Sequence, residues 1–185
     1  YKQSVLIYGS YGVLKYYHDL LSLQTPLVRI DRVQEFQKGK INVISVVDLE
    51  IGKDIILGQV SSVAGDAAYQ YIARAIADAM KGDISVVTTA PLNKEALHEG
   101  GHHFDGHTEI FATLTHTQTY TMMLWSDRMS VVHVSTHCAL REACNRATKK
   151  RVLECIHLAD DVMRRLEKKI PKIAVAGLNP HSGEA

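Results

Sequence analysis

The chain has 185 residues, of which 46% are hydrophobic and 22% charged, and its 21 basic side chains nearly balance its 20 acidic ones. This balance excludes the basic surface typical of proteins that bind nucleic acid or an anionic membrane. No apolar run approaches the roughly 20 residues that a membrane span requires. We therefore expect a small molecule or a second copy of the chain as partner, with no nucleic acid and no membrane.

Cysteine usage and the chain ends add two expectations. Cys138, Cys144 and Cys155 are odd in number and lack the spacing of a disulfide framework or a zinc ribbon, which favours a reducing compartment. We expect a cytoplasmic protein. The sequence opens at Tyr1 and stops within a polar stretch, "NPHSGEA", so we expect it to be part of a longer protein.

The first quarter of the chain alternates strand-like and helical patterns, which is typical of an α/β fold. "SVLIYG" (4–9) predicts a buried strand, and residues 11–21 predict a helix. "INVISVVDL" (41–49) predicts another strand, near a sheet edge or in a hairpin with "LVRIDRV" (27–33).

A long helix is predicted next. Apolar residues recur at three- and four-residue spacing from Ala68 to Met80, so Asp66 is the predicted N-cap and the helix should run to Lys81, with Gly82 ending it.

Three shorter elements follow this helix. "DISVVTTAP" (83–91) predicts a strand that ends at its proline, and "NKEALHE" (93–99) predicts a short helix. A further helix should begin with "HTE" and continue to Leu114.

The last third of the chain predicts a strand pair, a long helix and a final strand. "YTMMLWS" (120–126) and "MSVVHVST" (129–136) should pair in antiparallel fashion inside a mixed sheet. The apolar periodicity over residues 149–169 predicts a helix that Pro171 closes. "KIAVAGLNPHSGE" (172–184) predicts a buried strand leading into a polar loop.

Three polar loops directly follow apolar strands in this scheme. They are "TTAPLNKEAL" (88–97), "STHCAL" (135–140) and "LNPHSGE" (178–184). Ligands of open α/β sheets bind at the carboxyl ends of strands, where loops converge and helix N-termini point. We therefore expect these loops to share one site.

His137 and His181 are the predicted metal ligands. Each lies shortly after a predicted strand, and two imidazoles are a usual partial ligand set for a first-row divalent ion. Because two ligands do not complete a site, a third must come from elsewhere in the chain, from a segment outside it or from another subunit. For either histidine alone, the alternative is a hydrogen-bonded structural residue.

His107 and Thr108 are predicted to bind substrate. Gly106 allows the backbone to approach a ligand closely, and both residues lie at the start of a helix whose N–H groups favour anions. His102 and His103 are interpreted as solvated loop residues.

Asn93 and Lys94 form a second donor-rich loop that could hold a carboxylate or a phosphate, although an exposed lysine at a helix start is also common. The sequence contains neither G-x-G-x-x-G nor G-x-x-x-x-G-K-[ST], so a nucleotide cofactor would have to bind in another way.

Taken together, these motifs resemble the 4-hydroxythreonine-4-phosphate dehydrogenase family. The similarity extends from Gly65 to Ala185 and rests on "TTAPLNKEAL", "GHHFDGHTEIFATLT", "MMLWSDRMSVVHVSTH", "RVLECIHLADDVMRRL" and "KIAVAGLNPHSGE". The resemblance implies a three-layer α/β/α fold with a mixed sheet, like that of isocitrate and isopropylmalate dehydrogenases, with two domains in the full-length protein.

The resemblance also implies a reaction. Family members oxidise a hydroxyl of a 4-phosphorylated hydroxy acid with NAD and then release the neighbouring carboxylate as carbon dioxide, assisted by a divalent metal such as zinc, magnesium, cobalt or manganese. The stretches "VSTHCALREAC" and "LTHTQTYTMMLWSD" resemble the branch acting on D-threonate or D-erythronate 4-phosphate more than the pyridoxine (vitamin B6) branch, which acts on 4-hydroxythreonine-4-phosphate.

Residue by residue, His137 of "STH" and His181 of "NPHSGE" match metal ligands of the family, while His107 and Thr108 of "GHTE" match substrate-binding positions. The third metal histidine is expected from a partner subunit, which implies a homodimer with the metal site at its interface. The family's opening "GDPAGIGPE"-type motif and its C-terminal part lie outside this sequence. We therefore interpret residues 1–185 as a partial dehydrogenase that is inactive by itself.

Two alternatives stay open from the residues alone. The same histidines could activate water in a metal-dependent hydrolase. The chain could also be a non-catalytic domain that binds a phosphorylated ligand.

Overall fold

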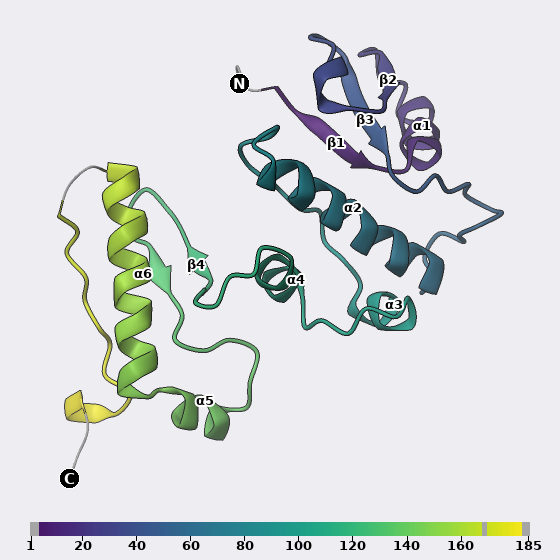
Figure 1. The fold of residues 1–185 in the computed structure, drawn as a ribbon. Helices are drawn as coiled ribbons and strands as arrows, with labels where there is room; N and C mark the ends of the chain where they lie inside the picture. Colours follow the sequence, from purple (N-terminus) through teal and green to yellow (C-terminus); the bar gives the residue numbers. More distant parts are fainter. Residues whose placement is uncertain (1–3, 168–169, 183–185) are drawn as a thin grey trace. The chain divides into compact units, whose positions relative to one another are not determined.

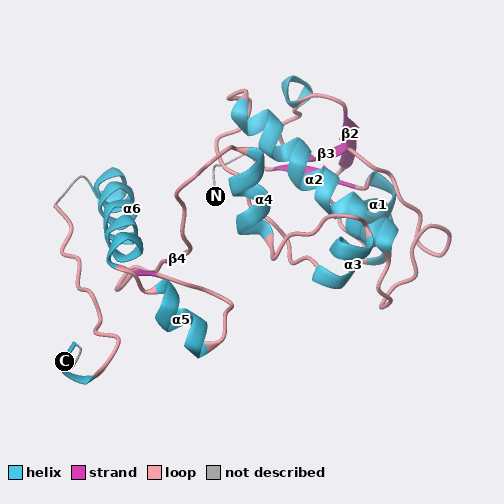
Figure 2. Cartoon of the chain, turned by 60° about the horizontal axis from the view of Figure 1, so that its bottom comes forward, coloured by secondary structure: helices cyan, strands magenta, loops and turns pink. Residues whose placement is uncertain are grey.

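The computed structural model describes residues 4–167 and 170–182 of the chain, which divides into two compact units (Figure 1). Unit 1 is Tyr1–His116 and unit 2 is Thr117–Ala185. Helices and strands occur in both units, so the predicted α/β class is confirmed (Figure 2). In the described part of the chain, no helix combines the length and the apolar character that crossing a membrane requires.

Unit 1 contains a parallel sheet of three strands in the order β1-β3-β2. The strands are β1 (Leu6–Gly9), β2 (Leu27–Ile30) and β3 (Ile41–Ser45), and both outer strands pair with β3 in parallel. The predicted edge or hairpin position of "INVISVVDL" is therefore wrong. Asn42, Val43 and Ile44 are buried in succession, the pattern of a strand covered on both faces, whereas a hairpin strand alternates.

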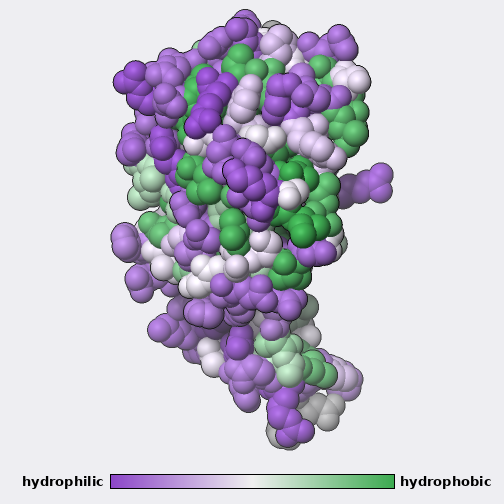
Figure 3. Space-filling view, turned by 90° about the vertical axis from the view of Figure 1, so that its right-hand side faces the viewer, coloured by the Kyte–Doolittle hydropathy of each residue, from purple (hydrophilic) through white to green (hydrophobic). Residues whose placement is uncertain are grey.

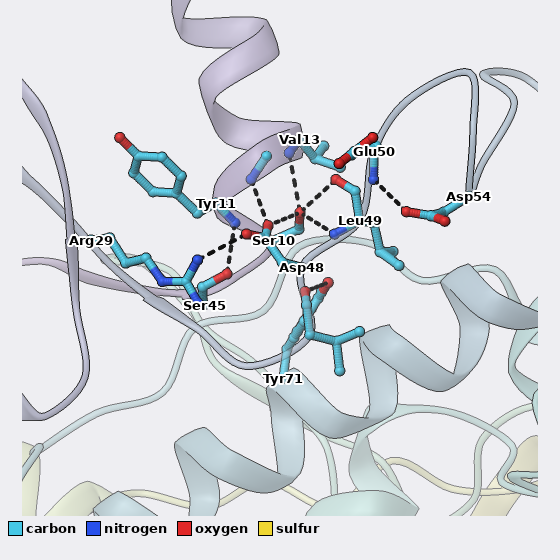
Figure 4. Close-up of polar contacts among 12 residues, drawn as sticks. Ser10, Tyr11, Val13, Arg29, Ser45, Asp48, Leu49, Glu50, Asp54 and Tyr71 are labelled. Carbon is cyan, nitrogen blue, oxygen red and sulfur yellow. Dashed lines mark hydrogen bonds and ion pairs between the residues drawn. The ribbon is translucent and has the colours of Figure 1, made fainter.

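The first helix, α1 (Tyr11–Leu20), is confirmed, and its N-terminus is filled by the protein's own side chains (Figure 4). The Ser10 hydroxyl accepts a hydrogen bond from the N–H of Val13 at 3.1 Å, and Asp48 Oδ1 accepts one from the N–H of Gly12 at 2.7 Å. Asp48 Oδ2 also accepts from the Arg29 guanidinium at 3.0 Å. At the carboxyl ends of β1 and β3, a carboxylate thus occupies the place that a ligand anion takes in many α/β proteins.

Helix α2 (Ser62–Met80) is longer than predicted. Its N-cap is Ser61, whose hydroxyl accepts from the N–H of Ala64 at 3.3 Å, so the prediction of Asp66 as N-cap is wrong. A serine provides the same capping chemistry as an aspartate, and the spacing of the apolar residues from Ala68 onward does not distinguish Ser61 from Asp66 as the cap. Gly82 has φ of 85° and follows the helix end, as predicted.

Two tyrosine side chains tie α2 to the sheet. The Tyr8 hydroxyl of β1 donates to Asp78 Oδ2 at 3.1 Å, and the Tyr71 hydroxyl donates to the carbonyl of Val47, just past β3, at 2.8 Å. Burial raises the pKa of Tyr71 to about 12, so its hydroxyl remains a donor at any physiological pH. These bonds attach α2 to the sheet at its middle and near its C-terminal end.

Asp78 is the main polar contact of this helix, because the residue is only 2% exposed and accepts three side-chain hydrogen bonds. Besides Tyr8, it accepts from Arg74 Nε at 3.0 Å and from Lys81 Nζ at 3.2 Å. Burial by itself raises the pKa of the Asp78 carboxyl, but the hydrogen bonds from Arg74, Lys81 and Tyr8 outweigh burial, so the net pKa lies below the ordinary 3.8.

We expect Asp78→Ala to lower the free energy of unfolding by about 2–3 kcal/mol near neutral pH, since a charge-assisted buried network is lost. A lowered folded-state pKa means that this stabilisation is complete above pH 3.8 and is lost as the pH falls through the folded-state pKa. Urea unfolding should therefore show the deficit at about pH 7 and a smaller one at about pH 3.

The matched control is Asp19→Ala, which removes an exposed carboxylate paired with Lys15 and should leave the free energy of unfolding almost unchanged. Equal deficits for the two variants would show that the buried network does not stabilise unit 1.

The two short helices of unit 1 are confirmed as α3 (Lys94–Glu99) and α4 (His107–Leu114). Together with α2 they enclose a small apolar core, and Figure 1 shows α3 and α4 beside α2. The buried members of this core are Ile72, Ile76, Leu97 and Ile110.

Unit 1 also presents apolar side chains to solvent, and Figure 3 shows hydrophobic groups among hydrophilic ones on one face. The largest exposed fractions on α1 and the turn after it are 62% for Leu20 and 63% for Leu21.

The prediction of a strand over "DISVVTTAP" is wrong. Residues 84–91 have no ladder hydrogen bonds, and Val86 is 78% exposed. A strand requires a neighbour to accept its backbone groups, and none of the described strands pairs with this segment.

In unit 2, the predicted antiparallel pair is confirmed as β4 (Met123–Leu124) and β5 (Val131–Val132). The pair forms a two-stranded sheet of its own, so its predicted place inside a mixed sheet is wrong. Helix α5 (Leu140–Arg146), which the sequence did not predict, follows, and then the predicted long helix α6 (Lys149–Glu167). Residues 168–169 of that prediction lie outside the described residues.

Arg151 fastens α6 to the strand pair. Its Nε donates to the carbonyl of Val134 and its Nη2 to that of Tyr120, both at 3.0 Å. Cys155, one turn further along α6, is buried beside the carbonyl of His133. Helix α6 thus contacts the residues that flank the strand pair through Arg151 and Cys155.

The prediction of a buried strand at the start of "KIAVAGLNPHSGE" is also wrong. Residues 172–179 are exposed and irregular, without a partner strand among the described residues, and the 3-10 turn η2 (Pro180–Ser182) follows. Residues 183–185 of the predicted polar loop lie outside the described part of the chain. As with "DISVVTTAP", an apolar β-branched run without a neighbour does not form a strand.

Candidate functional site

The predicted substrate residues His107 and Thr108 form the first turn of α4 in unit 1. Gly106 precedes them as N-cap, and no side chain within residues 4–167 and 170–182 caps this helix end. His107 is half-buried and Thr108 is exposed. The N–H groups at this helix start therefore differ from those of α1, which Ser10 and Asp48 already satisfy, and they remain suited to an anionic group of a ligand.

The second predicted pair, Asn93 and Lys94, lies at the N-terminus of α3 in the same unit. Asn93 Oδ1 accepts from the N–H of Ala96 at 2.9 Å, so the residue caps the helix. Its Nδ2 group is then the part of the side chain that can donate to a ligand. The Lys94 side chain is exposed, which fits either a phosphate contact or an ordinary surface lysine.

Helix α2 holds these two loops through a backbone contact with α3. A Cβ atom placed on Gly65 would lie 1.8 Å from the carbonyl oxygen of Ala96, and one placed on Gly100 would lie 2.6 Å from the nitrogen of Asp66. Leu97 of α3 and Ile110 of α4 complete the contact, because both are fully buried in the core that α2 shares with them. The positions of Asn93 and His107 are thus both set by α2.

The interpretation of His102 as a solvated loop residue is wrong. His102 Nε2 is hydrogen-bonded to Asp66 Oδ1 at 2.8 Å, and its ring stacks on Tyr69 with centroids 3.7 Å apart and planes 15° apart. His103 is exposed, as predicted. Sequence reasoning missed this contact because Asp66 and His102 are 36 residues apart and each had a local explanation.

The predicted metal ligands His137 and His181 both lie in unit 2 and are exposed. Neither follows a buried strand directly, since β5 ends at Val132 and no strand occurs between α6 and His181 among the described residues. Both have left-handed backbone, with φ of 51° and 56°. That conformation is uncommon for residues other than glycine and occurs often where the chain holds a side chain for binding.

His137 and His181 remain the two ligands that the sequence predicts from this chain. Among residues 4–167 and 170–182, no three His, Cys, Asp or Glu side chains come together as a metal site. The substrate residues belong to unit 1 and the histidines to unit 2, so a site shared by the three loops stays a prediction.

These features define an α/β domain in which polar loops at helix N-termini are held by a neighbouring helix. The chain belongs to the family described as pyridoxal phosphate biosynthetic protein PdxA, whose model matches residues 1–185.

The chain is similar to D-threonate 4-phosphate dehydrogenase of Salmonella typhimurium, with 43% identity over 86% of this chain and 50% of the relative. The protein of the same name from Pectobacterium atrosepticum is 46% identical over 80% of this chain and 45% of its own length. A crystal structure of 4-hydroxythreonine-4-phosphate dehydrogenase from Klebsiella pneumoniae superposes with a TM-score of 0.85 at 38% identity, covering 97% of this chain and 55% of that one. The chain thus spans about half the length of the curated relatives it matches.

Proposed function

We propose that the protein containing this chain is an NAD-dependent dehydrogenase of a 4-phosphorylated hydroxy acid, with D-threonate 4-phosphate as the first candidate substrate. The observation that carries the proposal is the family match over residues 1–185 together with relatives of that name at 43% and 46% identity. D-erythronate 4-phosphate and 4-hydroxythreonine-4-phosphate are the other candidates. The reaction transfers a hydride from the substrate carbinol to NAD, releases the hydroxyl proton and then loses the neighbouring carboxylate as carbon dioxide.

Within unit 1, His107 and Thr108 are proposed to bind the substrate at the uncapped N-terminus of α4. An anionic group is favoured there by the helix dipole and by the N–H groups of the first turn. Asn93 Nδ2 and the Lys94 ammonium are proposed as further donors to a carboxylate or a phosphate. All four residues would bind and orient the substrate, and none of them is assigned the transfer of a proton.

Within unit 2, His137 and His181 are proposed as two ligands of a divalent ion, for which zinc, magnesium, cobalt and manganese are candidates. Their imidazoles and their left-handed backbone fit that role, and a third ligand is proposed to come from a partner subunit in a homodimer. Such an ion lowers the pKa of a coordinated hydroxyl and polarises the carbonyl formed from it.

The test is an assay of the full-length protein with NAD, a divalent ion and each of the three phosphorylated acids. We expect NADH formation with one of them, equal in amount to the carbon dioxide released, and none with the corresponding unphosphorylated acid. Phosphate release without a need for NAD would instead indicate a metal-dependent hydrolase. Stoichiometric binding of the acid without turnover would indicate a non-catalytic domain.

A further inference from the structure

One histidine outside the proposed substrate contacts, His102, is attached to α2 by its side chain. The ring of His102 is hydrogen-bonded to Asp66 of α2 through Nε2 and lies flat on Tyr69 of the same helix. Tyr69 is also stacked with Phe104, with centroids 5.9 Å apart. The loop after α3 is therefore attached to α2 by a polar bond and by two ring contacts.

Asp66 is prepared for this contact by its neighbours. Its Oδ2 accepts from Gln70 Nε2 at 2.8 Å, which leaves Oδ1 directed to His102. The hydrogen bond from His102, together with that from Gln70, lowers the pKa of the Asp66 carboxyl, so the acceptor is ionised at neutral pH. Charge-assisted bonds of this kind are about twice as strong as neutral ones.

The loop held in this way leads directly to the proposed substrate residues. The N–H of His102 donates to the carbonyl of Leu97 at 3.0 Å, and the ring of His98 is bonded to the carbonyl of Phe104 at 3.0 Å. Gly106, the N-cap of α4, lies two residues after Phe104, and its carbonyl accepts from the N–H of the buried Ile110. We therefore expect the first turn of α4 to move when His102 moves, because only a short segment with its own hydrogen bonds separates them.

We propose that the Asp66–His102 pair is a positioning pair, which holds the first turn of α4 so that His107 and Thr108 meet the substrate in one geometry. This inference rests on the proposed function for its substrate, but the loop geometry it invokes can be measured without turnover. The pair itself does not touch the substrate. Its effect on binding comes from removing the freedom of the loop, because a loop that is already held in its bound conformation does not have to be ordered when the substrate binds.

The test compares three variants in the full-length protein. His102→Ala removes both the bond and the stacking, and His102→Gln places an amide donor near the position of Nε2 and retains the bond to Asp66. His103→Ala is the matched control, since its ring is exposed and adjacent in sequence, and the ring contact it makes is with His98 of α3, at 5.5 Å between centroids. The readouts are KM and kcat for D-threonate 4-phosphate and amide hydrogen exchange of residues 103–109.

We expect His102→Ala to raise KM about tenfold with kcat within about twofold of wild type, and to speed exchange across residues 103–109. His102→Gln should show a KM and an exchange rate of residues 103–109 close to those of wild type. His103→Ala should leave the KM and the exchange rate unchanged. If His102→Ala lowers the melting temperature and kcat without raising KM, or leaves loop exchange unchanged, the pair only supports folding and the inference is wrong.

Failure of the proposed function gives a different result. Wild-type protein would then reduce no NAD with any of the three acids, while loop exchange would still separate His102→Ala from His102→Gln and His103→Ala. That pattern would keep the positioning role and reject the substrate.

Discussion

Replacing either His137 or His181 by alanine is expected to remove the divalent ion and to lower kcat/KM by roughly a thousandfold. The size follows from the several kcal/mol that a metal contributes to stabilising charge at a reacting oxygen, since each 1.36 kcal/mol corresponds to about a tenfold change in rate. Both residues should behave alike, because a site with two imidazoles from one chain cannot lose either and keep its ion.

Metal content after dialysis and NAD reduction by the full-length protein are the measurements for this prediction. His157→Ala is the control, since it removes an exposed imidazole on α6 and should leave metal content and rate unchanged. Full metal occupancy in both His137→Ala and His181→Ala would reject the ligand assignment, whatever happens to the rate.

Gly65→Ala is expected to destabilise unit 1 by about 3 kcal/mol or more. Helix propensity alone predicts the opposite, because alanine is favoured over glycine inside a helix by about 1 kcal/mol. The steric effect is larger, since the added Cβ would lie 1.8 Å from the carbonyl oxygen of Ala96 and α3 would have to move away from α2. The same movement would shift Asn93 and the loop that carries His102.

Thermal and urea unfolding measure this effect, and Ala77→Gly in the same helix is the control. Ala77 is exposed, so its replacement should cost only the propensity difference of about 1 kcal/mol. A stabilising effect of Gly65→Ala would mean that the close backbone contact between α2 and α3 is not present in the protein. Loss of substrate binding with Gly65→Ala but not with Ala77→Gly would further connect the α2–α3 contact to the site.

The elements that the sequence predicted well are those with a local cause. Helices α1, α4 and α6 follow from apolar residues at helical spacing, α3 from a capping asparagine, and the end of α2 from Gly82 with its φ of 85°. The α/β class and the family resemblance were likewise available from motifs in the chain, and the family is confirmed over residues 1–185.

The elements that the sequence predicted wrongly depend on distant neighbours. The segments 83–91 and 172–179 have the composition of buried strands and yet are irregular, without a partner strand among the described residues. The stretch "INVISVVDL" begins with a central strand and not an edge strand. A segment becomes a strand only when the backbone of another segment hydrogen-bonds to it, and composition does not indicate which segment that partner is.

For the candidate site, the sequence by itself determined which side chains can do chemistry: the imidazoles of His107, His137 and His181 and the donors at Asn93 and Lys94. Only the tertiary structure decided that Asp48 closes the N-terminus of α1, that the N-terminus of α4 is left uncapped, and that Asp66 and His102 meet across 36 residues. The physical reason is that residue type sets what a group can donate or accept, whereas the packing of α2 against α3 sets which partner it reaches.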